Sequence, residues 1–207
     1  MEQKPEIRAV IFDLGGVILR TVDPQPRTLL AQQYGMTYAE IEEVVFNNPV
    51  ARQGESGQAT TEEVWAEVAR RMNLTDDQVP AFRRQFFGGD KVDFSLIELI
   101  QSLRGKYRTA LLSNTWIVDL PRFLREDLQI PDTFDVIISS AEVGVAKPNP
   151  EIFQVALEKV GAKPEEAVFV DDNFANIEAA SAIGIRTVRF FDVDEARRAL
   201  ATFVQVP

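Results

Sequence analysis

The chain of 207 residues contains neither cysteine nor histidine. Without cysteine it can form no disulfide and offers no thiol nucleophile, and without histidine it lacks the commonest general base and metal ligand. Any catalysis must therefore use carboxylate, amine or hydroxyl groups. Because oxygen atoms are the ligands that hard divalent cations prefer, these two absences favour a site built from acidic side chains.

Positive charge is also scarce. The sequence has 22 basic and 32 acidic residues, which give a net charge of −10. This charge opposes binding to polyanions, so we expect no nucleic acid and no membrane among the partners. Apolar runs stay below the roughly 18 residues that span a bilayer, and the first residues, MEQKPEIR, lack the basic-then-apolar order of a signal peptide. We expect a cytoplasmic protein, either a monomer or a homodimer.

Short apolar runs that alternate with helix-like stretches predict an α/β fold. Residues 8–13 are rich in branched and aromatic side chains and precede Gly15-Gly16, which indicates a buried strand ending in a tight turn. Further strands are expected at 109–113, 135–139, 167–170 and 186–190. Helices are expected at 96–103, 117–124, 150–160, 173–183 and 194–203. This alternation predicts a parallel, doubly wound sheet of Rossmann-like type with helices on both faces.

Residues 20–92 break this alternation and contain only helix-like patterns. These helices are expected at 27–34, 38–46, 61–72 and 76–87, with starts marked by Thr37, Thr61 and Thr75. We therefore expect a small helical bundle, residues 20–92, inserted after the first strand of an α/β core domain formed by residues 1–19 and 93–207. Linkers at 19–23 and 88–94 would form the hinge of a lid over an active site.

Two features of this insertion could bear on specificity. The aromatic residues Phe46, Trp65, Phe86 and Phe87 have helix-compatible spacing, which predicts a core for the bundle with one or two of them facing the site. The segment 53–57, QGESG, is either a plain connector or a specificity loop.

Polar residues follow the predicted strands at the carboxyl edge of the sheet, where ligands bind in folds of this class. They are Asp13, Ser113-Asn114, Lys147 and Asp171-Asp172. Each alone has a structural explanation as a turn, cap or solvated residue. Together, however, converging carboxylates repel each other unless a cation lies between them. A Mg²⁺ ion would resolve that conflict and hold a phosphate, so the set predicts a phosphoryl-binding site with a carboxylate free to attack phosphorus.

Four motifs in order, FDLGGV, LLSNT, AKPNPEIF and VFVDDNFANIEAA, resemble those of the haloacid dehalogenase superfamily. They span residues 12–180, and the helical insertion occupies the position of that superfamily's C1-type cap. The resemblance is greatest to the small-molecule phosphatases that include bacterial α-glucose-1-phosphatase. It extends more distantly to the N-terminal phosphatase domain of soluble epoxide hydrolase.

This resemblance implies a role for each matching residue around a metal. Asp13 would be the nucleophile, would become an aspartyl-phosphate and would also bind Mg²⁺. The backbone carbonyl of Gly15 and the carboxylate of Asp172 would be the other protein ligands. Asp171 would point either to a metal-bound water or to the Lys147 ammonium.

The resemblance also implies that Ser113 and Asn114 bind the phosphoryl group and that Lys147 neutralises charge on the nucleophile and the phosphate. Two departures from the family pattern are visible. Gly15 replaces an aspartate that acts as general acid and base, a function typically worth about 10²–10⁴-fold. Asn176 replaces a frequent acidic residue, which would reduce negative charge near the metal.

The sequence therefore predicts a Mg²⁺-dependent hydrolase of small phosphomonoesters. Because Gly15 cannot protonate a leaving group, we favour esters with an acidic leaving group, such as an anomeric or phenolic oxygen, and sugar phosphates in particular. Two alternatives stay open. One is a 2-haloacid dehalogenase, which would use the same aspartate but gain little from Asp172. The other is a non-catalytic protein that binds phosphometabolites.

Overall fold

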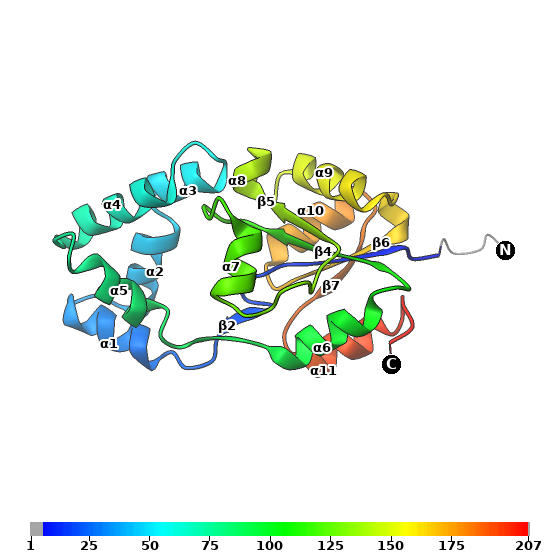
Figure 1. Ribbon diagram of the computed structural model, residues 1–207, viewed down its shortest axis with the longest axis horizontal. Coiled ribbons are helices and arrows are strands. Elements are labelled where there is room, and N and C mark those ends of the chain that lie inside the picture. The colour runs from blue at the N-terminus through cyan, green and yellow to red at the C-terminus, as the bar shows by residue number, and fades with distance from the viewer. Residues whose placement is uncertain (1–5, 207) are drawn as a thin grey trace.

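A five-stranded parallel sheet organises the larger part of the molecule (Figure 1). The computed structural model describes residues 6–206, so residues 1–5 and 207 of the predicted core domain lie outside the described residues. The strands are β1 (Ala9–Phe12), β4 (Arg108–Ser113), β5 (Val136–Ser139), β6 (Ala167–Asp171) and β7 (Arg186–Arg189). Their order is β5-β4-β1-β6-β7, and every pairing is parallel. The predicted α/β fold class is confirmed.

Helices cover both faces of this sheet because its strands are apolar on both. In β1, Val10 and Phe12 face a cluster that includes side chains of α6 (Phe94–Leu103), α7 (Leu120–Glu126) and α11 (Val193–Leu200). The intervening Ala9 and Ile11 face the other cluster. That side holds α8 (Ser140–Val143), α9 (Pro150–Val160) and α10 (Phe174–Ala182), and a 3₁₀ turn, η1 (Pro164–Glu166), precedes β6. The alternating side chains thus account for the doubly wound arrangement.

Five helices form a separate unit at one end of the sheet, the left side of Figure 1. We call this unit the helical module: α1 (Gln25–Gln33), α2 (Tyr38–Phe46), α3 (Pro49–Glu55), α4 (Thr61–Met72) and α5 (Val79–Phe86). Its helices enclose their own buried cluster, which includes Leu30, Ile41, Val68, Phe82 and Phe86. No helix within residues 6–206 combines the length and apolar character that crossing a bilayer requires.

Helix starts in the module agree only partly with the sequence prediction. Thr37 caps α2 as expected, but Thr60, not Thr61, caps α4. The reason is that a capping box needs an acid three residues after the cap, and Glu63 stands in that relation to Thr60. Helix α5 begins at Val79, after a turn in which the backbone N–H of Thr75 donates to the Gln78 side chain.

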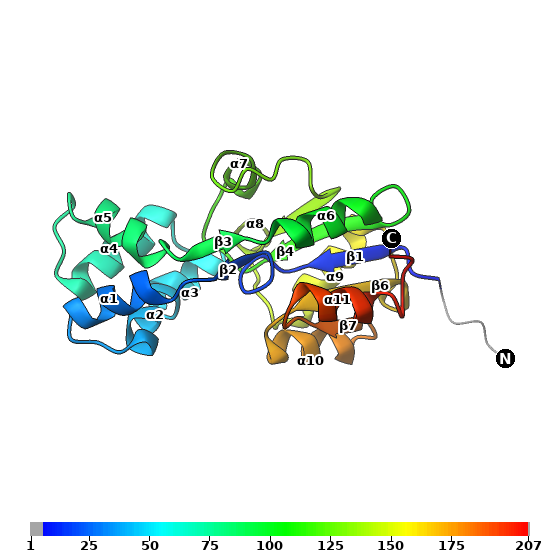
Figure 2. The same ribbon diagram turned by 90° about the horizontal axis from the view of Figure 1, so that it is seen from below.

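The two predicted linkers are not simple connectors. They contain β2 (Leu19–Thr21) and β3 (Asp90–Val92), which pair as an antiparallel ribbon between the sheet and the module (Figure 2). The predicted domain boundaries at 19/20 and 92/93 fall within β2 and at the end of β3. Helix α3 was also missing from the prediction; its N-cap is Asn48, and the QGESG segment begins within it.

A buried arginine links the parts of the module to the ribbon. Arg27 is 3% exposed, and its guanidinium donates to the Glu42 carboxylate at 2.6 Å and to both oxygens of Asp90 at 3.1 Å. It also donates to the Phe86 carbonyl and lies 4.2 Å from the centre of that ring. One charge thus holds α1, α2, α5 and β3 together.

We predict that Arg27→Met destabilises the protein by about 3 kcal/mol, because it leaves the partly buried carboxylates of Asp90 and Glu42 without their cation. The free energy of unfolding in urea would measure this effect. The matched control is Arg122→Met, which removes an exposed ion pair to Glu126 and should change the unfolding free energy little. Equal effects of the two substitutions would contradict the structural role of Arg27.

Candidate active site

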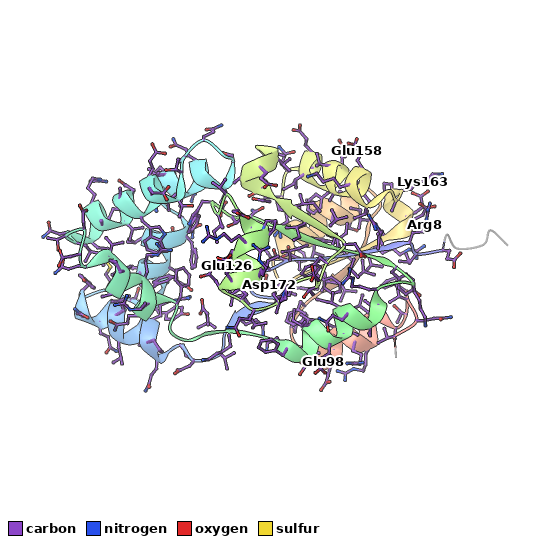
Figure 3. All side chains as sticks on the ribbon, in the orientation of Figure 1. Arg8, Glu98, Glu126, Glu158, Lys163 and Asp172 are labelled. Carbon is purple, nitrogen blue, oxygen red and sulfur yellow. The ribbon has the colours of Figure 1, made fainter. Side chains whose placement is uncertain are left out.

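The carboxyl ends of the central strands bring the predicted site residues to one edge of the sheet. Asp13 directly follows β1, while Ser113 and Asp171 are the last residues of β4 and β6. This edge faces the helical module: Asp172 lies near the middle of the molecule, whereas Arg8 lies at the far end of the sheet (Figure 3). Residues distant in the sequence therefore converge where the two parts of the molecule meet.

Lys147 lies at the centre of the site. Its ammonium nitrogen is 2.7 Å from Oδ1 of Asp13 and 2.7 Å from Oδ2 of Asp171. The lysine and both aspartates are buried. Of the two partners that the sequence allowed for Asp171, the structure therefore identifies the Lys147 ammonium. The pair of contacts fixes Oδ1 of Asp13 and leaves its Oδ2 for other partners.

Burial and mutual repulsion perturb the titration of this group. Burial raises the pKa of Asp13 to about 7; the Lys147 ammonium opposes the rise and the Asp171 carboxylate adds to it. Burial alone lowers the pKa of Lys147, but the two carboxylates outweigh burial and raise it above its ordinary value. The pKa of Asp172 is also raised, mainly by burial and to a smaller extent by the Asp171 carboxylate. One ammonium is thus too little positive charge for three neighbouring carboxyl groups.

Asp171 is held by further hydrogen bonds that fix its orientation. The backbone N–H of Asn173 donates to Oδ1 at 2.8 Å. The side-chain amide of Asn176 donates to Oδ1 at 3.2 Å and to Oδ2 at 3.0 Å. The sequence linked Asn176 to reduced charge near a metal, but here its amide serves as a donor to Asp171. The neutral side chain thus supports the Asp171 carboxylate without adding negative charge beside it.

Asn114 and Ser113 have different surroundings. The Asn114 amide donates to the Lys147 carbonyl at 2.8 Å, and its Oδ1 accepts from the Lys147 backbone N–H at 2.8 Å. This side chain therefore positions the lysine loop, and a contact with a phosphoryl group would have to use its backbone N–H. The Ser113 hydroxyl has a long contact of 3.4 Å to the Asn114 carbonyl and lines a cavity, so it can turn toward a ligand.

The acidic groups form a set that fits a hard divalent cation. Asp13, Asp171 and Asp172 each offer a carboxylate oxygen, and these oxygens lie within 4.8 Å of one another. Because Lys147 neutralises Asp171, the remaining oxygens of Asp13 and Asp172 are the candidates for a metal. The predicted use of the Gly15 carbonyl as a third ligand stays a prediction.

Two adjacent glycines shape this part of the site differently. Gly16 has a φ of 78°, and a Cβ there would collide with the Asp172 carboxylate. A Cβ on Gly15 would meet nothing within 4 Å. Gly16 therefore makes room for the acid, whereas Gly15 leaves the space above the site open.

A cavity of about 390 Å³ lies between the sheet edge and the helical module. Its walls from the module and ribbon are Leu19, Phe46, Glu55, Thr61, Trp65, Arg83, Phe87 and Asp90. Its walls from the α/β part are Leu14, Gly15, Ser113, Asn114, Thr115, Trp116, Ile117, Phe123 and Leu128.

The sequence identified only part of this cavity. Three of the four aromatic residues singled out in the insertion line it, and Phe86 is fully buried in the module. Helical spacing was the available signal for them. The sequence placed Ile117 and Phe123 in a helix at 117–124, which in the structure begins only at Leu120. It did not indicate that they or Trp116 line the cavity, because the path of the segment after β4 depends on tertiary packing.

Comparison with known proteins identifies related sequences. Residues 7–184 match the family model of the haloacid dehalogenase-like hydrolases. Acyl-CoA dehydrogenase family member 10 from Mus musculus is 29% identical over 97% of this chain, which spans only 19% of that protein. The sesquiterpene phosphatase astK from Aspergillus oryzae is 28% identical, with 86% and 87% of the two chains covered. The D-ribitol-5-phosphate phosphatase from Bacteroides thetaiotaomicron is 27% identical, with 87% and 90% covered.

Solved structures of haloacid dehalogenase-like proteins are also similar to this chain. A HAD-like family hydrolase from Porphyromonas gingivalis superimposes with a TM-score of 0.73 and 31% identity, covering 96% of this chain and 98% of that one. A HAD family enzyme from Bacteroides thetaiotaomicron, in complex with magnesium and inorganic phosphate, has a TM-score of 0.71 and 28% identity, covering 88% and 93%.

We predict that Gly16→Ala lowers both stability and affinity for Mg²⁺, because it strains the backbone by about 1–2 kcal/mol and displaces the Asp172 carboxylate. Gly105→Ala separates the two causes: Gly105 has a φ of 84°, but a Cβ there meets nothing within 4 Å. Urea unfolding and calorimetric titration with MgCl₂ measure the two effects. Unchanged Mg²⁺ affinity in Gly16→Ala would show that Asp172 does not need this space.

Proposed function

Because the chain belongs to the haloacid dehalogenase-like hydrolases, we propose that it is a Mg²⁺-dependent phosphatase of small phosphomonoesters. The observation that carries this proposal is the Asp13 carboxylate, held at 2.7 Å by Lys147, close to Asp172 and directly before Leu14 and Gly15, which line the cavity. The oxygen of Asp13 that Lys147 holds can attack phosphorus, while the other oxygen remains available for the metal. The phosphatases among the relatives, and the related structure with magnesium and phosphate, support the same chemistry.

In this proposal Asp13, Asp172 and the Gly15 carbonyl hold the Mg²⁺ ion. When bound, Mg²⁺ supplies positive charge that neutralises a phosphoryl oxygen and orients the phosphate. The Ser113 hydroxyl and the Lys147 ammonium can bind the remaining phosphoryl oxygens. These fixed donors stabilise the charge of the transferring group.

The reaction then has two steps at Asp13. First, the Asp13 oxygen that does not bind the metal attacks phosphorus, the ester P–O bond breaks and the alcohol leaves, which gives an aspartyl-phosphate. Then water attacks that phosphorus, the bond to Asp13 breaks, and inorganic phosphate and the free carboxylate are formed. Lys147 offsets negative charge on Asp13 and the phosphoryl group in both steps. Gly15 has no side chain to donate a proton, so the leaving oxygen must be acidic or take its proton from elsewhere.

Residues 20–92 serve as the cap of this site in our proposal, and residues 6–19 and 93–206 provide the chemistry. The shared cavity supports this division, because side chains of both parts line it. The ribbon of β2 and β3 connects the two parts. The cap would select the alcohol portion of the ester, while the sheet edge binds the phosphate.

We predict that Asp13→Asn lowers phosphate release from para-nitrophenyl phosphate by about 10³-fold or more, because an amide is not a nucleophile. EDTA should abolish release by the unchanged protein. Asp192→Asn is the matched control, since this exposed N-cap lies before α11 and asparagine can replace it. Turnover that survives Asp13→Asn would contradict the proposed nucleophile. Phosphate binding without any turnover would favour the non-catalytic alternative.

Mg²⁺ binding should depend on pH through Asp13. The pKa of about 7 in the metal-free protein means that Asp13 is largely protonated at lower pH and must lose its proton to bind a cation. Affinity should therefore rise by about tenfold per pH unit below pH 7 and level off above it. Calorimetric titration from about pH 5.5 to 8.5 measures this slope. A flat profile would contradict the raised pKa, and Asp13→Asn should remove the slope.

A further inference from the structure

Apolar side chains form most of the cavity beside the catalytic aspartate. Five aromatic residues contribute to its walls: Phe46, Trp65, Phe87, Trp116 and Phe123. Leucine and isoleucine side chains complete them, Ile117 among them. The volume of about 390 Å³ lies in the lower part of the range of about 300–1,000 Å³ for small-ligand sites. The cavity can therefore hold a compact alcohol portion against rings on several sides.

Polar side chains in the same walls are largely engaged already. The Thr61 hydroxyl donates to the Trp116 carbonyl at 2.7 Å, and the Thr115 hydroxyl accepts from the Ile117 backbone N–H at 3.0 Å. The first bond fixes the segment after β4 against α4, and the second fixes a turn within that segment. Their hydroxyl groups serve the protein's own backbone instead of a ligand.

The side chains of Asp90 and Asn114, which also line the cavity, are hydrogen-bonded to other parts of the protein. Asp90 accepts from the buried guanidinium of Arg27 with both oxygens at 3.1 Å, and also accepts from Thr21 at 2.7 Å. The Asn114 amide and carbonyl oxygen both bind the backbone of Lys147. Ser113 belongs to the phosphate end of the cavity.

Two polar side chains remain, Glu55 and Arg83. Neither has a hydrogen bond or an ion pair with another residue in the range 6–206, although the Arg83 guanidinium lies 4.6 Å from the ring centre of Trp65. A sugar or other polyol carries several hydroxyl groups, each of which needs a partner once it leaves water. Glu55 and Arg83 could pair only with the hydroxyl groups close to them, and a polyol enclosed by aromatic walls would leave its other hydroxyl groups without partners, whereas an apolar ring needs none.

We propose, as a deepening of the phosphatase function on which it rests, that the substrates are phosphate esters of apolar aromatic alcohols. Rings of this kind can pack edge-to-face against the aromatic walls. A phenolic oxygen also leaves without a proton donor more readily than an alkyl oxygen, which suits the glycine at residue 15. The sugar 1-phosphates favoured by the sequence also have an acidic leaving group, but their hydroxyl groups do not suit the aromatic walls.

The test compares phenyl phosphate, 2-naphthyl phosphate and glucose 1-phosphate with the Mg²⁺-loaded protein. The two aryl esters have leaving groups of similar acidity, so they differ mainly in apolar area. We expect kcat/KM to be about tenfold higher for the naphthyl ester than for the phenyl ester. Both should exceed glucose 1-phosphate. Faster hydrolysis of glucose 1-phosphate than of 2-naphthyl phosphate would overturn the proposal.

A pair of neighbouring variants locates the effect in the cavity. Ile117→Thr should raise KM for 2-naphthyl phosphate and lower the ratio of kcat/KM for 2-naphthyl phosphate to that for glucose 1-phosphate by about fivefold, because it removes apolar surface from the cavity wall. Val118→Thr is the matched control, because Val118 is 63% exposed and absent from the cavity walls. Equal effects of both variants would contradict the assignment.

Binding measurements distinguish failure of this proposal from failure of the phosphatase function. Calorimetric titration with phenylphosphonate and 2-naphthylphosphonate requires no turnover, and the naphthyl compound should bind about tenfold more tightly. No Asp13-dependent release from any ester, with this order of binding retained, would contradict the phosphatase function alone. Phosphatase activity with equal binding of the two phosphonates would contradict the apolar-alcohol proposal alone.

Discussion

The contact of one buried ammonium with two buried carboxylates is the constraint on which the site depends. Parallel strands carry their terminal side chains to one edge, so β1 and β6 place Asp13 and Asp171 close together. Without Lys147 the two charges could not both be buried there. Two side-chain amides support this contact: Asn114 fixes the loop that carries Lys147, and Asn176 fixes the Asp171 carboxylate. The Asp13 carboxylate is thus oriented by the fold itself.

In the proposed function, chemistry and selectivity come from different parts of the molecule. The sheet edge supplies Asp13, Ser113 and Lys147, whereas the module supplies much of the apolar wall. The two parts are in close contact: a Cβ on Gly54 would lie 2.8 Å from Cβ of Trp116, and one on Gly57 would collide with the Ala141 carbonyl. Helix α3 therefore packs tightly against the α/β part, and the wall of the cavity includes side chains from both.

The sequence predicted what depends on local pattern and strand order. Apolar runs located the five parallel strands, polar residues at strand ends located Asp13, Ser113 and Asp171, and the loop after the third predicted strand located Lys147. It did not predict the β2–β3 ribbon, since each strand has only three residues and is stable only through its partner. Nor could it place the Asn114 side chain on the lysine loop, because that contact joins residues 33 positions apart. Most of the cavity could not be predicted from the sequence for the same reason, because its walls come from segments that meet only in the folded chain.

The most direct test of this account is to trap the phosphorylated intermediate. The Mg²⁺-loaded protein would be mixed with excess para-nitrophenyl phosphate and quenched in acid within the first turnovers, and its peptides examined by mass spectrometry. We predict a phosphoryl group on Asp13, absent from the same peptide of Asp13→Asn. Turnover with the phosphoryl group on another residue, or with none on the protein, would contradict the assignment of Asp13 as nucleophile.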